Sequence, residues 1–205
     1  MVRRAIVRIE QGRDLVPEMR RHVQSQRPRL GPPARRRLAR VSQLAQVNVA
    51  RLRAPLDDPI MKDFVAAVTR VHHLAETSPG FVWRLNTEHG HGLCVTADDG
   101  AAAFLNLSVW QDYEQLHAFT YRSAHGQFVR HRSRWFEPTR SPSTALWWVP
   151  SGAPPTAAEA ARRLAYLRAH GPSPRAFSLR RRFTPSGERE PMASRTTRLP
   201  RRTAY

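Results

Sequence analysis

The hydrophobic pattern changes period several times between residues 44 and 183, which is typical of a domain that mixes strands and helices. Five runs have the length and the apolar or β-branched composition of strands. They cover residues 44–52, 81–85, 93–96, 102–110 and 145–149. A further alternating run, residues 176–183, is typical of an edge strand or an arm.

Three stretches between these strands have helical spacing and recognisable ends. The first follows Asp58-Pro59, an N-cap acid before a proline suited to the first helical position. The second is opened by Asp112, breaks near Ser123 and extends to residue 136, and the third is opened by the capping box Thr156 to Glu159. The order β-α-β-β-α-β predicts an α+β, ferredoxin-like fold with a C-terminal helix-strand appendage.

The strands at 102–110 and 145–149 are apolar at nearly every position, in both phases of the alternation. An antiparallel sheet with one face in water alternates instead between apolar and polar residues. The second face therefore needs a cover, and the sheet of another copy is the simplest one. The pattern predicts a homodimer that packs sheet on sheet.

Charge changes this picture only at the two ends. The formal net charge is +18, of which residues 1–41 contribute +9 and residues 179–205 contribute +6. Arginine and proline without apolar periodicity predict a basic disordered arm over 1–41 and a basic disordered tail over 185–205, around a domain at 42–184. Such a charge is typical of nucleic-acid binders, but no motif of a DNA- or RNA-binding fold accompanies it, so we expect no nucleic-acid partner.

The sequence lacks the signatures of several other classes of protein. No apolar run reaches the roughly 18 residues of a membrane-spanning helix, and the N-terminus lacks the apolar region of a signal peptide. The single cysteine, Cys94, cannot form a disulfide within the chain. His89 and His91 lack a third ligand at a recognisable spacing. We expect a cytoplasmic protein without membrane contact, bound metal or cofactor.

The densest polar cluster is Tyr121-Arg122-Ser123-Ala124-His125. A continuous helix would place Tyr121 and His125 on one face, where His125 serves as a base while Tyr121 and Arg122 stabilise developing negative charge. These three residues are the candidate catalytic residues. In the alternative interpretation, Ser123 starts a new turn, His125 makes a structural hydrogen bond and Tyr121 packs.

Two amides, Asn48 and Asn106, lie inside otherwise apolar strands. A buried amide without partners costs roughly 1–3 kcal/mol, so each must pair with backbone or point into a pocket. Trp83 and Trp110 are the aromatic residues expected to line such a pocket, with core packing as the alternative. These four residues are the candidate ligand-binding residues.

Several strings are specific enough to indicate a family. They are LAQVNVARL at 44–52, PGFVWRL at 79–85, NLSVW at 106–110, FTYRSAH at 119–125 and LWWVP at 146–150. Over about residues 43–183 the chain resembles the bacterial family called domain of unknown function 3291, which is similar to the dimeric α/β-barrel superfamily. The resemblance implies a dimeric barrel related to cofactor-free antibiotic-biosynthesis monooxygenases and to haem-degrading enzymes.

In the related haem-degrading enzymes, an Asn on the first strand, a Trp and a His form the working set. Asn48 occupies a comparable position, but Phe119 and Val129 stand where the Trp and His are found. The resemblance therefore favours a protein that binds a small apolar or aromatic molecule, with a cofactor-independent, monooxygenase-like reaction as one outcome. A non-catalytic dimeric binding module and a haem-binding protein are the alternatives, and whether the chain is an enzyme stays open.

Overall fold

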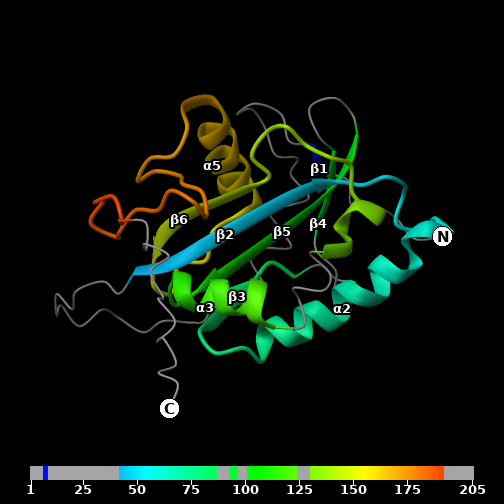
Figure 1. The fold of residues 1–205 in the computed structure, drawn as a ribbon, viewed down its shortest axis with the longest axis horizontal. Helices are drawn as coiled ribbons and strands as arrows, with labels where there is room; N and C mark the ends of the chain where they lie inside the picture. The colour runs from blue at the N-terminus through cyan, green and yellow to red at the C-terminus, as the bar shows by residue number, and fades with distance from the viewer. Residues whose placement is uncertain (1–6, 9–41, 87–92, 97–100, 124–129, 192–205) are drawn as a thin grey trace, which may run out of the picture.

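The computed structural model describes residues 7–8, 42–86, 93–96, 101–123 and 130–191 (Figure 1). Its strands are β1 (Val7–Arg8), β2 (Ser42–Arg51), β3 (Phe81–Arg84), β4 (Leu93–Thr96), β5 (Ala102–Trp110) and β6 (Thr144–Pro150). Its helices are α2 (Lys62–Glu76), α3 (Tyr113–His117) and α5 (Ala157–His170), with shorter turns η2 (Pro59–Met61), η3 (Ala118–Arg122) and η4 (Arg132–Arg134). Within the described residues, no helix combines the length and the apolar content needed to cross a bilayer.

The sheet has β2 and β5 at its centre, and the fold is α+β as predicted (Figure 1). β6 pairs with one edge of β2 and β5 with the other, both antiparallel. The free edge of β5 is shared by two short strands, because β3 pairs near Trp110 and β4 pairs near Ala102. The order β6-β2-β5-β3/β4 is consistent with the predicted ferredoxin-like arrangement. β1 lies parallel to β4, so Val7 and Arg8 of the predicted basic arm pair with the sheet.

Helix α5 covers one face of the sheet. Its N-cap is Thr156, whose hydroxyl accepts a hydrogen bond from the Glu159 backbone N–H at 3.1 Å, as the capping box predicts. The buried residues that α5 shares with the sheet form one cluster: Ala45, Val47, Leu105, Leu107, Val109, Ala145, Trp147, Ala160, Leu164 and Leu167. Over β6 and β2, the apolar face from which the homodimer was predicted is thus covered by α5, and a dimer through this part would have to displace that helix.

The opposite face of the sheet carries α2, α3 and the short turns. The buried side chains between them and the sheet form two separate apolar clusters. The Trp110 cluster contains Leu44, Ala75, Trp110, Leu116, Leu146 and Phe177. The Phe104 cluster contains Leu52, Met61, Phe64, Val68, Phe104 and Trp135. Helix α2 contributes to both, with Val68 in one and Ala75 in the other, so it runs along the sheet from the Phe104 cluster to the Trp110 cluster.

The chain after α5 returns along the outer edge of β6. Leu146 and Phe177 exchange two backbone hydrogen bonds of 2.8 Å, which accounts for the strand-like pattern predicted there. Further on, the Arg182 guanidinium lies 3.8 Å from the centre of the Tyr113 ring and pairs with Glu190 at 3.0 Å. Burial raises the pKa of the Tyr113 phenol above its usual value. The structure describes the chain up to residue 191, which includes the first residues of the predicted basic tail.

Candidate functional site

Five polar side chains lie on the face of the sheet that carries α2 and α3, between the Trp110 cluster and the Phe104 cluster. The strand register places Asn48 opposite both Asn106 and Thr144, and Gln46 opposite Ser108 in the neighbouring row. We call this group the polar band: Gln46, Asn48, Asn106, Ser108 and Thr144. Side chains alternate between the two faces of a strand. Since Val47, Leu105 and Leu107 pack against α5, the polar band faces α2.

The middle of the polar band is open to solvent. Gln46 and Ser108 are buried, at 9% and 6% exposure. Asn48, Asn106 and Thr144 are only partly buried, although they cross three adjacent strands in the interior of the sheet. The apolar residues of the two clusters on either side are almost fully buried. Solvent therefore reaches the middle of the polar band, between the more deeply buried Trp110 and Phe104 clusters.

Hydrogen bonds join four of the five side chains of the band, and among the described residues only Asn106 takes part in none. Ser108 Oγ donates to Gln46 Oε1 and accepts from Trp110 Nε1, both at 3.0 Å. Asn48 Nδ2 donates to Thr144 Oγ1 at 2.9 Å. Among the described residues, the Asn106 amide has no hydrogen-bond partner, and the Gln46 Nε2 group donates to none. Two amide groups of the band therefore have hydrogen-bonding capacity that no described residue uses.

His72 is a buried imidazole on the inner face of α2, and the sequence analysis did not select it. It is 6% exposed and lies on the buried stripe of α2, between Val68 and Ala75. Because those two residues belong to the Phe104 and Trp110 clusters, His72 lies over the stretch of sheet that carries the polar band. The sequence signal that could have identified His72 as buried is its spacing, because it continues the helical repeat of apolar residues at positions 64, 68 and 75.

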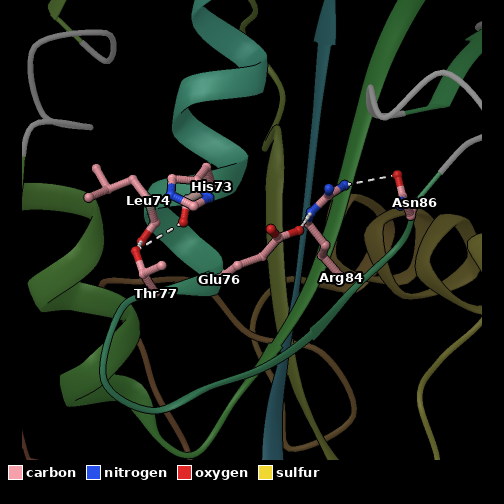
Figure 2. Close-up of polar contacts among 6 residues, drawn as sticks. All are labelled: His73, Leu74, Glu76, Thr77, Arg84 and Asn86. Atoms are coloured by element: carbon pink, nitrogen blue, oxygen red, sulfur yellow. Dashed lines mark hydrogen bonds and ion pairs between the residues drawn. The ribbon is translucent and has the colours of Figure 1, made fainter.

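A guanidinium lies at the edge of the band. Arg84 of β3 is opposite Ser108 in the register and is on the same face, since the preceding Trp83 packs on the α5 side. Figure 2 shows Arg84 Nε donating to Glu76 Oε1 at 2.7 Å and Nη1 donating to Asn86 Oδ1 at 3.3 Å. The Arg84 side chain is 10% exposed. This contact ties the C-terminus of α2 to the sheet and places an ion pair beside the polar band.

The same view shows how α2 ends. Thr77 Oγ1 donates to the backbone oxygens of His73 and Leu74, at 3.0 and 3.3 Å (Figure 2). These bonds satisfy carbonyl groups that have no partner inside a helix terminus. The chain then turns through Gly80, whose φ of 74° is in the left-handed region that favours glycine, and enters β3. The turn positions Arg84 over the end of the helix.

The predicted ligand-binding residues separate into two groups. Asn48 and Asn106 lie side by side in the polar band, as a shared site requires. Trp110 is 1% exposed, with its ring stacked on Phe119 at 4.9 Å and edge-on to Phe81 at 5.4 Å. Its indole supports Ser108 from within the core. Trp83 packs on the α5 side of the sheet and lies away from the band.

The predicted catalytic residues do not lie on one continuous helix. Tyr121 and Arg122 are exposed at the end of η3, with the Tyr121 ring 4.8 Å from that of His117. The next residue, Ser123, has extended backbone angles, so the helix ends there. His125 lies outside the described residues, as do His89 and His91. Within the described parts of the chain, no three His, Cys, Asp or Glu side chains gather in a group that would hold a metal ion.

Replacing Ser108 with Ala is expected to lower the free energy of unfolding by about 1–3 kcal/mol, because the buried Trp110 Nε1–H and Gln46 Oε1 both lose their partner. Urea denaturation measures this change. Ser151→Ala, at an exposed turn, is the matched control and should stay within about 0.5 kcal/mol of the wild type. Equal stability of the two variants would show that Ser108 does not support the band.

Comparisons with known proteins give a family and two solved structures. The family model of the domain of unknown function DUF3291 matches residues 43–193, which include the whole polar band. The chain is similar to NE2512, a protein of unknown function from Nitrosomonas europaea, with 13% identity over 57% of this chain and 96% of that chain and a TM-score of 0.35. It is also similar to PA3566 from Pseudomonas aeruginosa, with 11% identity over 56% and 98% and a TM-score of 0.35. Comparison with curated proteins gives no match.

Proposed function

The chain belongs to the family of the domain of unknown function DUF3291, and we propose that its folded part binds a small molecule at the polar band. The observation that carries the proposal is the Asn106 amide, which is partly buried at the centre of the sheet and has no partner among the described residues. Because this amide is only partly buried, water can satisfy it in the free protein, and a polar group of a ligand can take the place of that water. Asn106 is therefore the side chain of the band that we expect to form a hydrogen bond with the ligand.

The surroundings of the band define the kind of molecule. Apolar and aromatic side chains of the Trp110 and Phe104 clusters border it on both sides, which suits a ligand with a largely apolar or aromatic body. The free amides of Asn106 and Gln46 offer hydrogen-bond donors to polar groups on that body. The Arg84 guanidinium at the edge is neutralised by its ion pair with Glu76, so it sets no preference for the charge of the ligand.

The test is native mass spectrometry of freshly purified full-length protein. The wild-type chain is expected to carry a small molecule that survives gentle ionisation and dissociates on activation. Asn106→Leu should lose this adduct, whereas Gln111→Leu, which alters an exposed amide just beyond the end of β5, should keep it. An adduct retained by Asn106→Leu would place the binding site elsewhere, and a wild-type chain without any adduct would contradict the proposal.

A monooxygenase-like reaction is the second candidate, and the buried His72 imidazole supports it. Proton abstraction from a bound molecule needs a base close to the ligand, and a neutral imidazole can act as one. His72 is placed over the band by the stripe of α2 that joins the two clusters. In this scheme the amides of the band orient the substrate and His72 accepts its proton. Binding without catalysis requires only the amides.

A further inference from the structure

A groove lined by charged side chains opens on the outer side of α5, on the sheet face away from the polar band. It has a volume of about 190 Å³ and is lined by Glu159, Arg162, Arg163 and Arg175. The first three project from α5, and Arg175 comes from the segment that follows the helix, drawn beside it in Figure 1. Pockets for drug-sized molecules have volumes of about 300–1,000 Å³, so this groove suits a single charged group.

Two of the arginines are held in place by contacts on the protein. Glu159 Oε1 accepts a hydrogen bond from Arg163 Nη2 at 3.0 Å, and Arg163 Nη1 donates to the backbone oxygen of Arg175 at 2.7 Å. The Arg175 guanidinium lies over the Tyr166 ring, 4.5 Å from its centre. Side chains that are fixed before binding lose less entropy when a ligand arrives. Arg163 and Arg175 are therefore preorganised, whereas Arg162 is an exposed side chain that would order on binding.

The groove carries more positive than negative charge. Its one carboxylate, Glu159, is paired with Arg163. Arg162 and Arg175 have no carboxylate partner in the described part of the chain. Two guanidinium groups that face a common space without a counter-ion favour a ligand with two negative charges. Guanidinium groups bind phosphate oxygens through paired, charge-assisted hydrogen bonds.

We propose that this groove binds the dianionic phosphate group of a phosphate monoester, with Arg162 and Arg175 as its main ligands. Arg163 holds Arg175 through its backbone oxygen and contributes the remaining edge of the groove. This site lies on the side of the sheet that α5 covers and does not depend on the polar band. It is also independent of the basic ends of the chain, since all four lining residues belong to the folded part.

The test uses the full-length chain and inorganic phosphate at pH 8, with ionic strength held constant by sodium chloride, because exposed charges are screened by salt. Isothermal titration calorimetry is expected to show saturable binding to one site. Arg162→Ala and Arg175→Ala should each weaken it by about tenfold or more, as the loss of a charge-assisted hydrogen bond implies. Arg134→Ala removes an equal charge from exposed η4, away from any groove residue, and should change the affinity less than twofold.

Two further arms guard against a loss of folding and identify the source of the phosphate. Glu159→Gln removes the competing carboxylate and should leave phosphate affinity equal or higher, so weaker binding in this variant contradicts the proposal. Dimethyl phosphate, a monoanionic diester like the backbone of a nucleic acid, should bind at least about tenfold more weakly than phosphate. Equal affinity for the diester, equal losses in all three arginine variants, or no saturable binding would each overturn the assignment.

Discussion

Asn106→Leu is expected to make the ligand-free protein more stable, while it removes the ability to bind a molecule at the polar band. In the wild-type chain the Asn106 amide is partly buried and has no partner among the described residues, so it relies on water for its hydrogen bonds. Leucine has a similar size and would lie between two apolar clusters. Replacing a residue whose role is binding is thus expected to raise the stability of the ligand-free protein, whereas replacing a residue whose role is packing lowers it.

The measurement is thermal or urea unfolding of protein from which any bound molecule has been removed by refolding, because a ligand that binds only the folded state adds its own stabilisation. For a domain of 150–250 residues, each kcal/mol corresponds to about 2–4 °C in melting temperature. Gln111→Leu should shift the melting temperature very little, since its side chain is exposed. Destabilisation by Asn106→Leu would indicate that the amide supports the fold.

Much of the fold follows from local signals in the sequence. Strands β2, β5 and β6 are continuous apolar runs, and the caps of η2, α3 and α5 are formed by Asp58, Asp112 and Thr156. Each cap depends on a side chain that bonds a backbone N–H two or three residues away, so it can be recognised from spacing alone. The juxtaposition of Asn48 and Asn106 was also within reach, because both interrupt apolar strands of one sheet.

The rest of the site depends on contacts between distant segments. His72 is the one polar residue in an otherwise apolar stripe of α2. The sequence indicates that this position is buried, but it does not show which part of the sheet the imidazole faces. Arg84 joins the band because a register shift within β3 sets which face it occupies. On the α2 side of the sheet, the polar band stays partly exposed because the two apolar clusters do not meet over it, which depends on how α2 packs. Single-sequence periodicity contains none of this information.

The homodimer was predicted on the premise that another copy of the chain must cover the second apolar face of the sheet. This premise was wrong over β6 and β2, because α5 of the same chain covers that part of the face. Periodicity shows that a strand is buried on both sides, but it does not say which segment buries it. The helix Ala157–His170 was predicted as an appendage without a position. The homodimer itself stays a prediction, and it now requires a surface other than the one beneath α5.

Leu164→Ala is expected to lower the free energy of unfolding by about 2–5 kcal/mol, the range for a large-to-small change in a packed core. Leu164 is 3% exposed and belongs to the cluster that joins α5 to the sheet, together with Val47 and Trp147. Leu164→Arg places a charge at the same point, where it cannot be hydrated unless α5 lifts. The second change should therefore expose the apolar face of the sheet.

An exposed apolar face of this size promotes association, so Leu164→Arg should self-associate at micromolar concentration in light scattering after size-exclusion chromatography. The matched control is Ala165→Arg, at an exposed position one residue further along α5, which adds the same charge on the outer side of the helix. It should keep both the stability and the oligomeric state of the wild-type chain. If Leu164→Arg instead behaves like Ala165→Arg in urea unfolding and in light scattering, α5 does not cover the sheet in solution. The bare face predicted from the sequence would then be available for the partner copy.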